Sequence, residues 1–484
     1  MFWRDEDPPT SQLNEGGSSG IFQALRGAAR QMQATHGTMP LMYPKNLLDH
    51  CAALLEQVLQ FRQPADAVLS QYFRDQRTLG SRERATLAET VYSVLRQKNL
   101  FDALAETGAG SVSCNKAGSH KGSNKARCLA ILGFAGERAF LQTLLTAPEQ
   151  QWLATCEQAR AGALPPVQRH NLPTWLADAI AAQVGTRFDA VALALLQQAE
   201  LDVRVNTLLA KRTQAIQSLQ QAGLQAQATP YSPWGIRLAG KPKLAQLDAM
   251  RNGQIEVQDE GSQLLAVLLD AKRGEIVVDF CAGAGGKTLA LGAAMRNTGR
   301  LYALDVSAHR LEKLKPRLAR SGLNNVHLMA IADESDERIS RLAGKADRVL
   351  VDAPCSGLGT LRRSPDLKWR QTPQTVQEMA QKQAAILKSA ARLLKPGGRL
   401  VYATCSVLEA ENEAVAAAFT AAQPQFEPLN AAQMLEALKV PQAATLCSQQ
   451  EGACAGVPAG QYLRLWPDVH GTDGFFAAIW QKKA

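Results

Sequence analysis

Two cysteines occupy matching positions in the chain, each just after an apolar stretch that is typical of a buried strand. Cys355 follows residues 348–351, and Cys405 follows residues 399–403. Ligands of open α/β sheets bind over the carboxyl ends of the strands, so both thiols are expected to face one crevice. A single free cysteine is usually a small buried hydrophobe, but two at matched strand ends favour a chemical role. That role is a thiolate adding covalently to a substrate.

A glycine turn joins another apolar stretch, 276–280, to a helical pattern. It reads Cys281-Ala282-Gly283-Ala284-Gly285-Gly286-Lys287-Thr288. Glycines let backbone amides approach a ligand, and the helix N-terminus offers unpaired N–H donors. A phosphate-binding Walker A loop would need glycine at position 281, where this chain has cysteine.

A nucleoside cofactor fits this turn better, provided that an acid ends the next strand about 20 residues further on. Asp305 ends the apolar stretch 301–304 and meets that requirement. Asp333 follows a third predicted strand, 326–331, and is placed to reach an adenine edge, with a helix cap as the alternative role.

A thiol beside a nucleoside cofactor suits methylation of cytosine at C5. That carbon is a poor nucleophile, but addition of a thiolate at C6 gives it enamine character. After transfer from a sulfonium donor, a base removes the C5 proton and the thiol leaves, and two cysteines can divide this work. Asp352 can hold the amino edge of the ring and favour protonation at N3. The residues alone do not say which cysteine attacks.

The elements that must position these residues change along the chain. Residues 257–484 repeat strand, glycine turn and helix, which predicts a doubly wound parallel sheet. Residues 45–165 carry apolar side chains at helical spacing, including a helix start at Ser81, and predict a helical domain. Residues 166–256 are interpreted as linker helices followed by a small α+β subdomain.

Two segments lack a core-forming pattern. Residues 1–44 are predicted to be a disordered leader, with Met39 or Met42 as alternative translation starts. Residues 108–127 are rich in Gly, Ser and Lys without one acid and predict a mobile basic loop. This loop is either a solvated insertion or a contact to RNA phosphates.

Composition limits the class of protein. The 484 residues allow several domains, and 53 Lys and Arg against 44 Asp and Glu give a net charge of +9, which favours polyanionic partners. No apolar stretch of 18 residues and no signal peptide is evident, so a cytoplasmic protein without a membrane segment is predicted. Nine cysteines without a Cys-x-x-Cys pair predict neither a disulfide framework nor a metal site.

These motifs resemble the bacterial cytosine-5 rRNA methyltransferases of the RsmB-like, or Sun/Fmu, family. The resemblance spans about residue 45 to the end and is weaker in the N-terminal third. It implies a Rossmann-like α/β methyltransferase domain preceded by an all-α NusB-like RNA-binding domain and a small α+β (RRM-like) subdomain. The motifs that carry it are 279–288, 352–357, 403–406, 257–263 and 470–476.

The resemblance also implies roles for the site residues. Cys405 would be the nucleophile and Cys355 would aid product release. Residues 281–287, Asp305, Asp333 and Asp352 would line S-adenosylmethionine, with Asp352 and Lys287 also near the target base. Ala284 departs from the family pattern, where many members have proline.

Two basic stretches are candidates for RNA binding. The first, 310–320, is interpreted as a solvated helix face. The second directly follows the Cys355 loop and includes Trp369, which suits phosphate contacts and the stacking of a splayed base. Its predicted RNA-binding residues are Arg362, Arg363, Lys368 and Arg370.

The sequence therefore predicts a monomeric enzyme that methylates C5 of a cytosine in 16S rRNA through a covalent cysteine–C6 adduct. The target base is expected to leave its stack to reach the thiol. Alternatives are the same chemistry on tRNA, 23S rRNA or DNA, and a non-catalytic RNA-binding assembly factor. Both cysteines and the cofactor loop are intact, which argues against the last.

Overall fold

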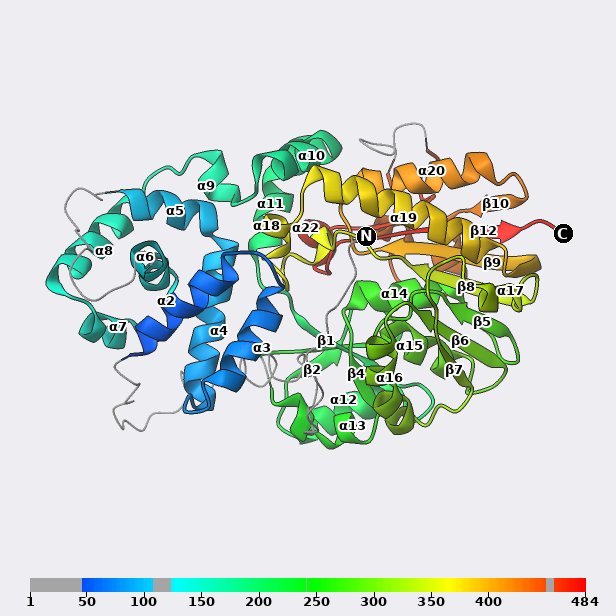
Figure 1. Ribbon diagram of the computed structural model, residues 1–484. Helices are drawn as coiled ribbons and strands as arrows, with labels where there is room; N and C mark the ends of the chain where they lie inside the picture. The colour runs from blue at the N-terminus through cyan, green and yellow to red at the C-terminus, as the bar shows by residue number, and fades with distance from the viewer. Residues whose placement is uncertain (1–45, 108–122, 241, 450–456) are drawn as a thin grey trace.

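The computed structural model describes residues 46–107, 123–240, 242–449 and 457–484. The predicted leader, 1–44, and most of the predicted basic loop, 108–122, lie outside these residues. The described chain comprises an all-α region, a small antiparallel sheet and a large mixed sheet covered by helices (Figure 1). This arrangement confirms the predicted α/β fold class.

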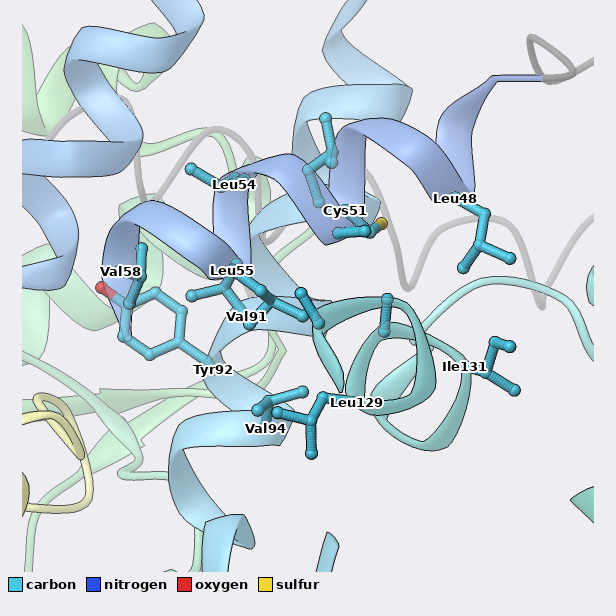
Figure 2. Packing of buried hydrophobic residues seen from close by; sticks show 14 of the residues in the cluster. Leu48, Cys51, Leu54, Leu55, Val58, Val91, Tyr92, Val94, Leu129 and Ile131 are labelled. Carbon is cyan, nitrogen blue, oxygen red and sulfur yellow. The ribbon is translucent and has the colours of Figure 1, made fainter. Parts of the chain in front are cut away.

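The all-α region packs around α6, the helix that lies among the others in Figure 1. Figure 2 shows side chains of three helices meeting there, among them Cys51 and Leu55, Val91, and Leu129. The helices are α2 (Leu47–Val58), α3 (Ala65–Asp75), α4 (Ser81–Arg96), α5 (Lys98–Glu106), α6 (Ser123–Gly133), α7 (Arg138–Leu144) and α8 (Ala147–Arg160). The predicted helix start at Ser81 is confirmed.

The end of the predicted basic loop is wrong, because α6 already begins at Ser123. Lys125 forms an ion pair with Asp102 of α5 at 2.9 Å. Arg127 pairs with Glu149 of α8 at 2.6 Å. Acidic partners on neighbouring helices therefore let these basic residues join the helical region.

The predicted linker helices do more than connect domains. They are α9 (Pro166–His170), α10 (Thr174–Val184) and α11 (Phe188–Leu196). Leu176 and Val191 share a buried cluster with Leu358 and Val407 of the large-sheet unit. Among the described residues, Thr174–Leu196 alone has the length and apolar composition of a membrane span, but a 3-10 turn at Gly185–Arg187 divides it.

The small sheet is antiparallel throughout, in the order β2-β3-β1-β4. Its strands are β1 (Leu201–Val205), β2 (Ala226–Ala228), β3 (Gly235–Leu238) and β4 (Ile255–Val257). The helices α12 (Arg212–Gln221) and α13 (Asp248–Arg251) accompany them. Val203 and Ile236 from the strands pack with Ala215 of α12 in one core.

The large sheet has the order β10-β12-β9-β8-β5-β6-β7, with β11 paired to β12. The five neighbouring strands β9, β8, β5, β6 and β7 are parallel, and β12 runs antiparallel to β9. Chain order reverses between β5 and β8, which makes their carboxyl ends the expected ligand-binding edge. The strands are β5 (Ile276–Asp279), β6 (Arg300–Asp305), β7 (Val326–Ala330), β8 (Ala346–Asp352), β9 (Leu394–Thr404), β10 (Phe426–Leu429), β11 (Leu463–Leu465) and β12 (Phe475–Lys482).

Helices cover both faces of this sheet, because successive strand residues point to opposite sides. Val277 packs in a cluster with Leu264 of one helix layer, whereas Val278 packs with Ile386 of the other. Figure 1 shows α19 and α20 lying together along the sheet. The remaining helices are α14 (Glu260–Leu269), α15 (Gly286–Ala294), α16 (Ala308–Ser321), α17 (Glu337–Ser340), α18 (Leu367–Arg370), α19 (Pro373–Ala391), α20 (Glu413–Ala422), α21 (Ala431–Ala437) and α22 (Pro467–His470).

Candidate active site

The two sequence-predicted cysteines lie side by side at the carboxyl ends of β8 and β9. These strands are parallel neighbours, and Asp352 pairs with Ala403 at their last register position. Cys355 and Cys405 follow those positions, and their Sγ atoms are 3.4 Å apart. Both side chains are only partly buried. The thiols are therefore close enough to share a hydrogen bond and to act on the same part of one substrate molecule.

Close backbone packing fixes the loop that follows Cys355. The amide of Gly359 donates to the carbonyl of Cys405 at 2.8 Å, and the amide of Gly474 donates to Gly359 at 2.9 Å. A Cβ atom at Gly359 would lie 2.1 Å from the Gly474 oxygen and 2.7 Å from the Cys405 oxygen. Only glycine lets these three segments meet.

A charged pair lies beside the thiols. Lys287 Nζ donates to Asp352 Oδ2 at 2.6 Å. Burial acts to lower the pKa of Lys287, but the charge of Asp352 outweighs it, and Cys405 contributes in the same direction, so the pKa is raised. Lys287 is therefore a permanent cation between the glycine turn and the cysteines.

Two cysteines of this region, Cys355 and Cys281, have thiols with a raised pKa. The hydrogen bond with Cys405, together with burial, raises the pKa of Cys355 well above its ordinary value. Burial and then the charge of Asp352 also raise the pKa of Cys281 well above the ordinary value. Cys355 and Cys281 are therefore neutral thiols at physiological pH.

The glycine turn has the open backbone that a nucleoside cofactor needs. Gly283 and Gly285 have φ angles of 57° and 85°. A Cβ at Gly285 would lie 2.1 Å from a Leu314 methyl carbon, whereas one at Gly283 would meet no atom within 4 Å. The turn is thus packed against α16 on one side and open on the other, and α15 starts at Gly286 with its N–H donors.

Asp305 ties this turn to the end of β6. Its Oδ2 accepts from the amide of Gly283 at 2.7 Å, and its Oδ1 accepts from Ser307 at 2.8 Å. The side chain lies at the switch-point edge, where an acid can accept from ribose hydroxyls through its remaining lone pairs. The turn and Asp305 together fit the predicted cofactor.

Asp333 lies beyond β7 and is exposed. It accepts from the amide of Ser335 at 2.7 Å. The alternative of a helix cap is wrong, because Asp336 caps α17 by accepting from Arg338. Contact of Asp333 with an adenine edge stays a prediction.

The RNA-contact prediction for the second basic stretch is corrected by burial. Lys368 is 2% exposed and donates to the carbonyl of Arg96 in α4 at 2.9 Å. Arg362 is 6% exposed and donates to the carbonyl of Gly471 at 2.6 Å. Trp369 donates to the Leu95 carbonyl at 2.8 Å. This stretch joins the all-α region to the large-sheet unit.

The other two predicted RNA-binding residues are also engaged within the chain. Arg363 donates to Asp473 at 2.6 Å and to Asp259 at 2.8 Å. Arg370 pairs with Asp366 at 3.4 Å. The partners of Arg363, Asp259 and Asp473, lie far away in sequence, so the sequence around Arg363 does not reveal these ion pairs.

The first basic stretch behaves partly as expected. Lys313 and Lys315 of α16 are exposed. Arg317 and Arg320, however, form ion pairs with Glu256 of β4 at 3.0 and 2.5 Å. The outer face of α16 is solvated, and its inner face binds the small antiparallel unit.

Sequence analysis missed three polar residues that are buried beneath the cysteine loops. They are Gln383 of α19, Glu411 of the 3-10 turn Glu409–Glu411, and Asn412, each fully buried. Glu409, Glu411 and Glu413 together look like a solvated acidic run. The one available signal was their closeness in sequence to Cys405.

Comparison with family models places most of the described chain in two matches. Residues 266–481 match a model described as 16S rRNA methyltransferase RsmB/F. Residues 172–245 match the ferredoxin-like domain of RsmF/B-like methyltransferases, in agreement with the predicted small α+β subdomain.

Curated relatives extend the similarity upstream. The ribosomal RNA small subunit methyltransferase B of Xylella fastidiosa is 30% identical over 421 residues, which cover 82% of this chain and 89% of the relative. The probable ribosomal RNA small subunit methyltransferase B of Synechocystis is 34% identical over 319 residues, covering 65% of this chain and 68% of the relative.

Solved structures share the fold. A methyltransferase homologue from Pyrococcus horikoshii is 30% identical with a TM-score of 0.57 and covers 66% of this chain and 100% of that one. The protein PH0851 has a TM-score of 0.70 at 24% identity and covers 91% of this chain and 100% of that one.

Proposed function

Because the chain belongs to the RsmB/F family of 16S rRNA methyltransferases, we propose that it methylates C5 of a cytosine in 16S rRNA through a covalent Cys405–C6 adduct. The family and an rRNA methyltransferase activity agree with the sequence prediction, as does S-adenosylmethionine as methyl donor. The observation that carries the proposal is the pair of thiols 3.4 Å apart at the strand edge that also holds the glycine turn.

S-adenosylmethionine supplies a methyl group activated by its sulfonium when bound. Residues 281–287 would hold it with backbone amides, and Asp305 would accept from its ribose hydroxyls. Asp333 and Asp352 would complete the cofactor site. The open side of Gly283 supports this assignment, since no side chain of the described residues would meet a Cβ placed there.

Cys405 acts as the nucleophile in this proposal. Its sulfur, as the thiolate, adds to C6 of cytosine, which makes C5 electron-rich. After methylation a base takes the C5 proton, the C5–H electron pair forms the C5=C6 bond, and the C6–S bond breaks with its electron pair returning to sulfur. The raised pKa of Cys355 supports the division of roles, because a protonated Cys355 thiol can donate to the neighbouring sulfur as charge returns to it. Cys355 therefore assists release.

Lys287 and Asp352 act on the polar edge of the base. Addition at C6 pushes electron density into the ring, and a fixed charged pair can stabilise that density without reorganising. Asp352 would hold the amino edge and favour protonation at N3, with Lys287 keeping the carboxylate oriented at 2.6 Å. We propose rRNA as the partner, and a monomer in the cytoplasm that needs neither metal nor membrane.

The test uses S-adenosylmethionine carrying a tritiated methyl group and total RNA from cells that lack the protein. The wild type should yield 5-methylcytosine in 16S rRNA. Cys405→Ala should abolish transfer, and Cys355→Ala should accumulate an RNA adduct that migrates with the protein on a denaturing gel. Cys128→Ala, a partly buried cysteine of α6, is the matched control and should retain activity.

Three outcomes would contradict parts of the proposal. An adduct that accumulates in Cys405→Ala reverses the roles of the cysteines. Label in tRNA or 23S rRNA keeps the chemistry and overturns the substrate. Absence of label in every fraction, with assembly particles included as substrate, overturns the enzymatic activity.

A further inference from the structure

We propose that Glu411 is a positioning residue that sets the separation of the Cys355 and Cys405 thiols. The proposal rests on the proposed function, in which these thiols divide the covalent chemistry. Glu411 Oε1 accepts from the amide of Ser356 at 2.7 Å, and its Oε2 accepts from the hydroxyls of Ser356 and Ser406 at 2.5 Å each. Each serine directly follows one of the cysteines, so one carboxylate connects both cysteine loops.

The donors to this carboxylate are neutral. Gln383 adds a fourth hydrogen bond, from Nε2 to Glu411 Oε1 at 3.1 Å. Glu411 is fully buried. Burying a carboxylate without a cation is costly. The four hydrogen bonds from Ser356, Ser406 and Gln383 offset that cost only while both cysteine loops keep their positions. An apolar side chain at this position would avoid the cost of burying a charge. The buried carboxylate is therefore better explained by the geometry that it gives to the two cysteine loops.

A second set of hydrogen bonds fixes the backbone of Glu411 and the side chain of Gln383. The Tyr402 hydroxyl contacts the backbone oxygen of Glu411 at 2.5 Å and Gln383 Oε1 at 3.0 Å. Gln383 Nε2 also donates to the carbonyl of Pro354 at 3.0 Å. The residues before and after Cys355 are thereby held by Gln383 and Glu411.

Asn412 does the same for the second cysteine. Its Oδ1 accepts from the Thr404 hydroxyl at 2.5 Å, and its Nδ2 donates to the carbonyl of Ser406 at 2.9 Å. The residues on both sides of each cysteine are therefore fixed by Gln383, Glu411 and Asn412. The hydrogen bonds of these three side chains reach the residues next to the cysteines and not the sulfur atoms, which makes them positioning residues and not catalytic ones.

The expected benefit is preorganisation. A displacement of about 1 Å in a catalytic group can cost about 100-fold in rate, so two thiols that act in succession need a fixed separation. Loss of the Glu411 carboxylate leaves the two loops joined by the backbone contact of Gly359 with Cys405 and by the weaker hydrogen bond between the Ser356 and Ser406 hydroxyls at 3.3 Å. The distribution of Sγ–Sγ distances should then broaden.

The test measures that separation without RNA or cofactor. Full-length protein is equilibrated with glutathione buffers: glutathione disulfide oxidises the two thiols to a Cys355–Cys405 disulfide, and two molecules of reduced glutathione form. Peptide mapping by mass spectrometry quantifies this disulfide among the other cysteines. The equilibrium constant reports how closely the folded protein holds the two sulfurs.

Glu411→Ala should lower this constant about tenfold, which is about 30 mV in reduction potential. Glu411→Gln should restore it to near the wild-type value, because the amide oxygen still accepts from Ser356 and Gln383 while its nitrogen donates to the serine hydroxyls. If Glu411→Ala does not fold, Ser406→Ala detaches only the second loop and should lower the constant by a smaller factor.

Glu260→Gln is the matched control. Glu260 is an equally buried carboxylate that accepts from the amides of Tyr231 and Ser232 at 2.6 Å, away from the cysteine loops. It should alter stability without altering the constant. A constant that is unchanged or higher in Glu411→Ala, or lowered equally in Glu260→Gln, overturns the proposal.

Activity provides an arm that separates this proposal from the proposed function. Glu411→Ala should lower kcat at least tenfold with an unchanged KM for S-adenosylmethionine. If the wild type makes no 5-methylcytosine, the proposed function fails while the thiol equilibrium still tests Glu411. If methylation is observed and kcat is unaffected in Glu411→Ala, the positioning role is overturned.

Discussion

Two stretches of the chain look alike in sequence and have different surroundings in the structure. Residues 310–320 and 362–370 are both short and rich in Arg and Lys. The first belongs to α16, where Lys313 and Lys315 are exposed and Arg317 and Arg320 share the carboxylate of Glu256. The second lies between the all-α region and the large sheet, where Lys368 is 2% exposed.

The two stretches differ in the partners of their basic side chains. On α16 the exposed lysines meet water or the neighbouring Glu312, and Arg317 and Arg320 share the carboxylate of Glu256, with Arg317 also donating to the carbonyl of Ala284. The exposed lysines therefore contribute little to the unfolding free energy. In 362–370 several donors are directed at backbone carbonyls of distant segments, such as Lys368 to Arg96 and Trp369 to Leu95. A basic stretch beside the Cys355 loop can therefore join two parts of the molecule through buried donors such as Lys368 and Arg362.

Among variants of the two stretches, Arg363→Ala should lower the unfolding free energy the most. It leaves Asp259 and Asp473 buried without their cation, which should cost about 3 kcal/mol of unfolding free energy. Chemical denaturation followed by tryptophan fluorescence measures the loss. Arg317→Ala is the control from the other stretch and should cost about 1 kcal/mol, because Glu256 keeps Arg320 as its cation and only the Ala284 carbonyl loses its donor. Equal losses in the two variants would mean that the two stretches do not differ in how much their arginines stabilise the fold.

Lys368→Met should have an intermediate effect, about 1–2 kcal/mol at pH 7, since the Arg96 carbonyl loses its donor. The effect should depend on pH. Burial, followed by the charge of Arg96, lowers the pKa of Lys368 well below its ordinary value. The unfolded chain then binds more protons than the folded one between the two pKa values, so wild-type stability rises with pH there.

The measurement is the difference in unfolding free energy between the wild type and Lys368→Met from pH 7 to pH 10. The wild type should gain relative to the variant as the pH rises. A difference that stays constant over this range would mean that Lys368 is not buried as a disfavoured cation.

The smallest effect is expected for the double variant Lys313→Ala and Lys315→Ala. Both side chains are exposed, so the unfolding free energy should change by less than about 0.5 kcal/mol. RNA affinity measured against salt concentration sharpens the comparison. An unchanged salt dependence supports a solvated face, whereas a shallower one would show that α16 contacts RNA phosphates.

Much of the large-sheet unit could be predicted, because its apolar strands and glycine turns are local signals. The strands that precede Asp305 and Cys355 lie where the sequence placed them, as β6 and β8. The beginning of β9 could not be predicted, because Gly397 and Gly398 resemble a turn. In the structure β9 already starts at Leu394, and the register with β8 shifts between Ala346 and Arg348.

The site was predictable where chemistry and motif coincide and unpredictable where packing decides. The cysteines and the glycine turn stand at strand ends that hydropathy reveals. Glu411 and Gln383 come from a short acidic turn and a helix whose polar residues look solvated. Their burial follows from tertiary packing alone, and the same is true of Arg362 and Lys368, which the sequence predicts to contact RNA.

The contact of Gly359 with both Cys405 and Gly474 has a consequence for biosynthesis. Gly474 leads into β12, which is inserted between β10 and β9 and is made after every other strand of this sheet. Until that strand leaves the ribosome, the edge of β9 opposite β8 has no strand partner, whereas the Cys355 loop beside Cys405 is already complete. Nascent chains that have not yet released β12 therefore expose this edge of β9, and the contact of Gly359 with Gly474 forms only after both segments have been made.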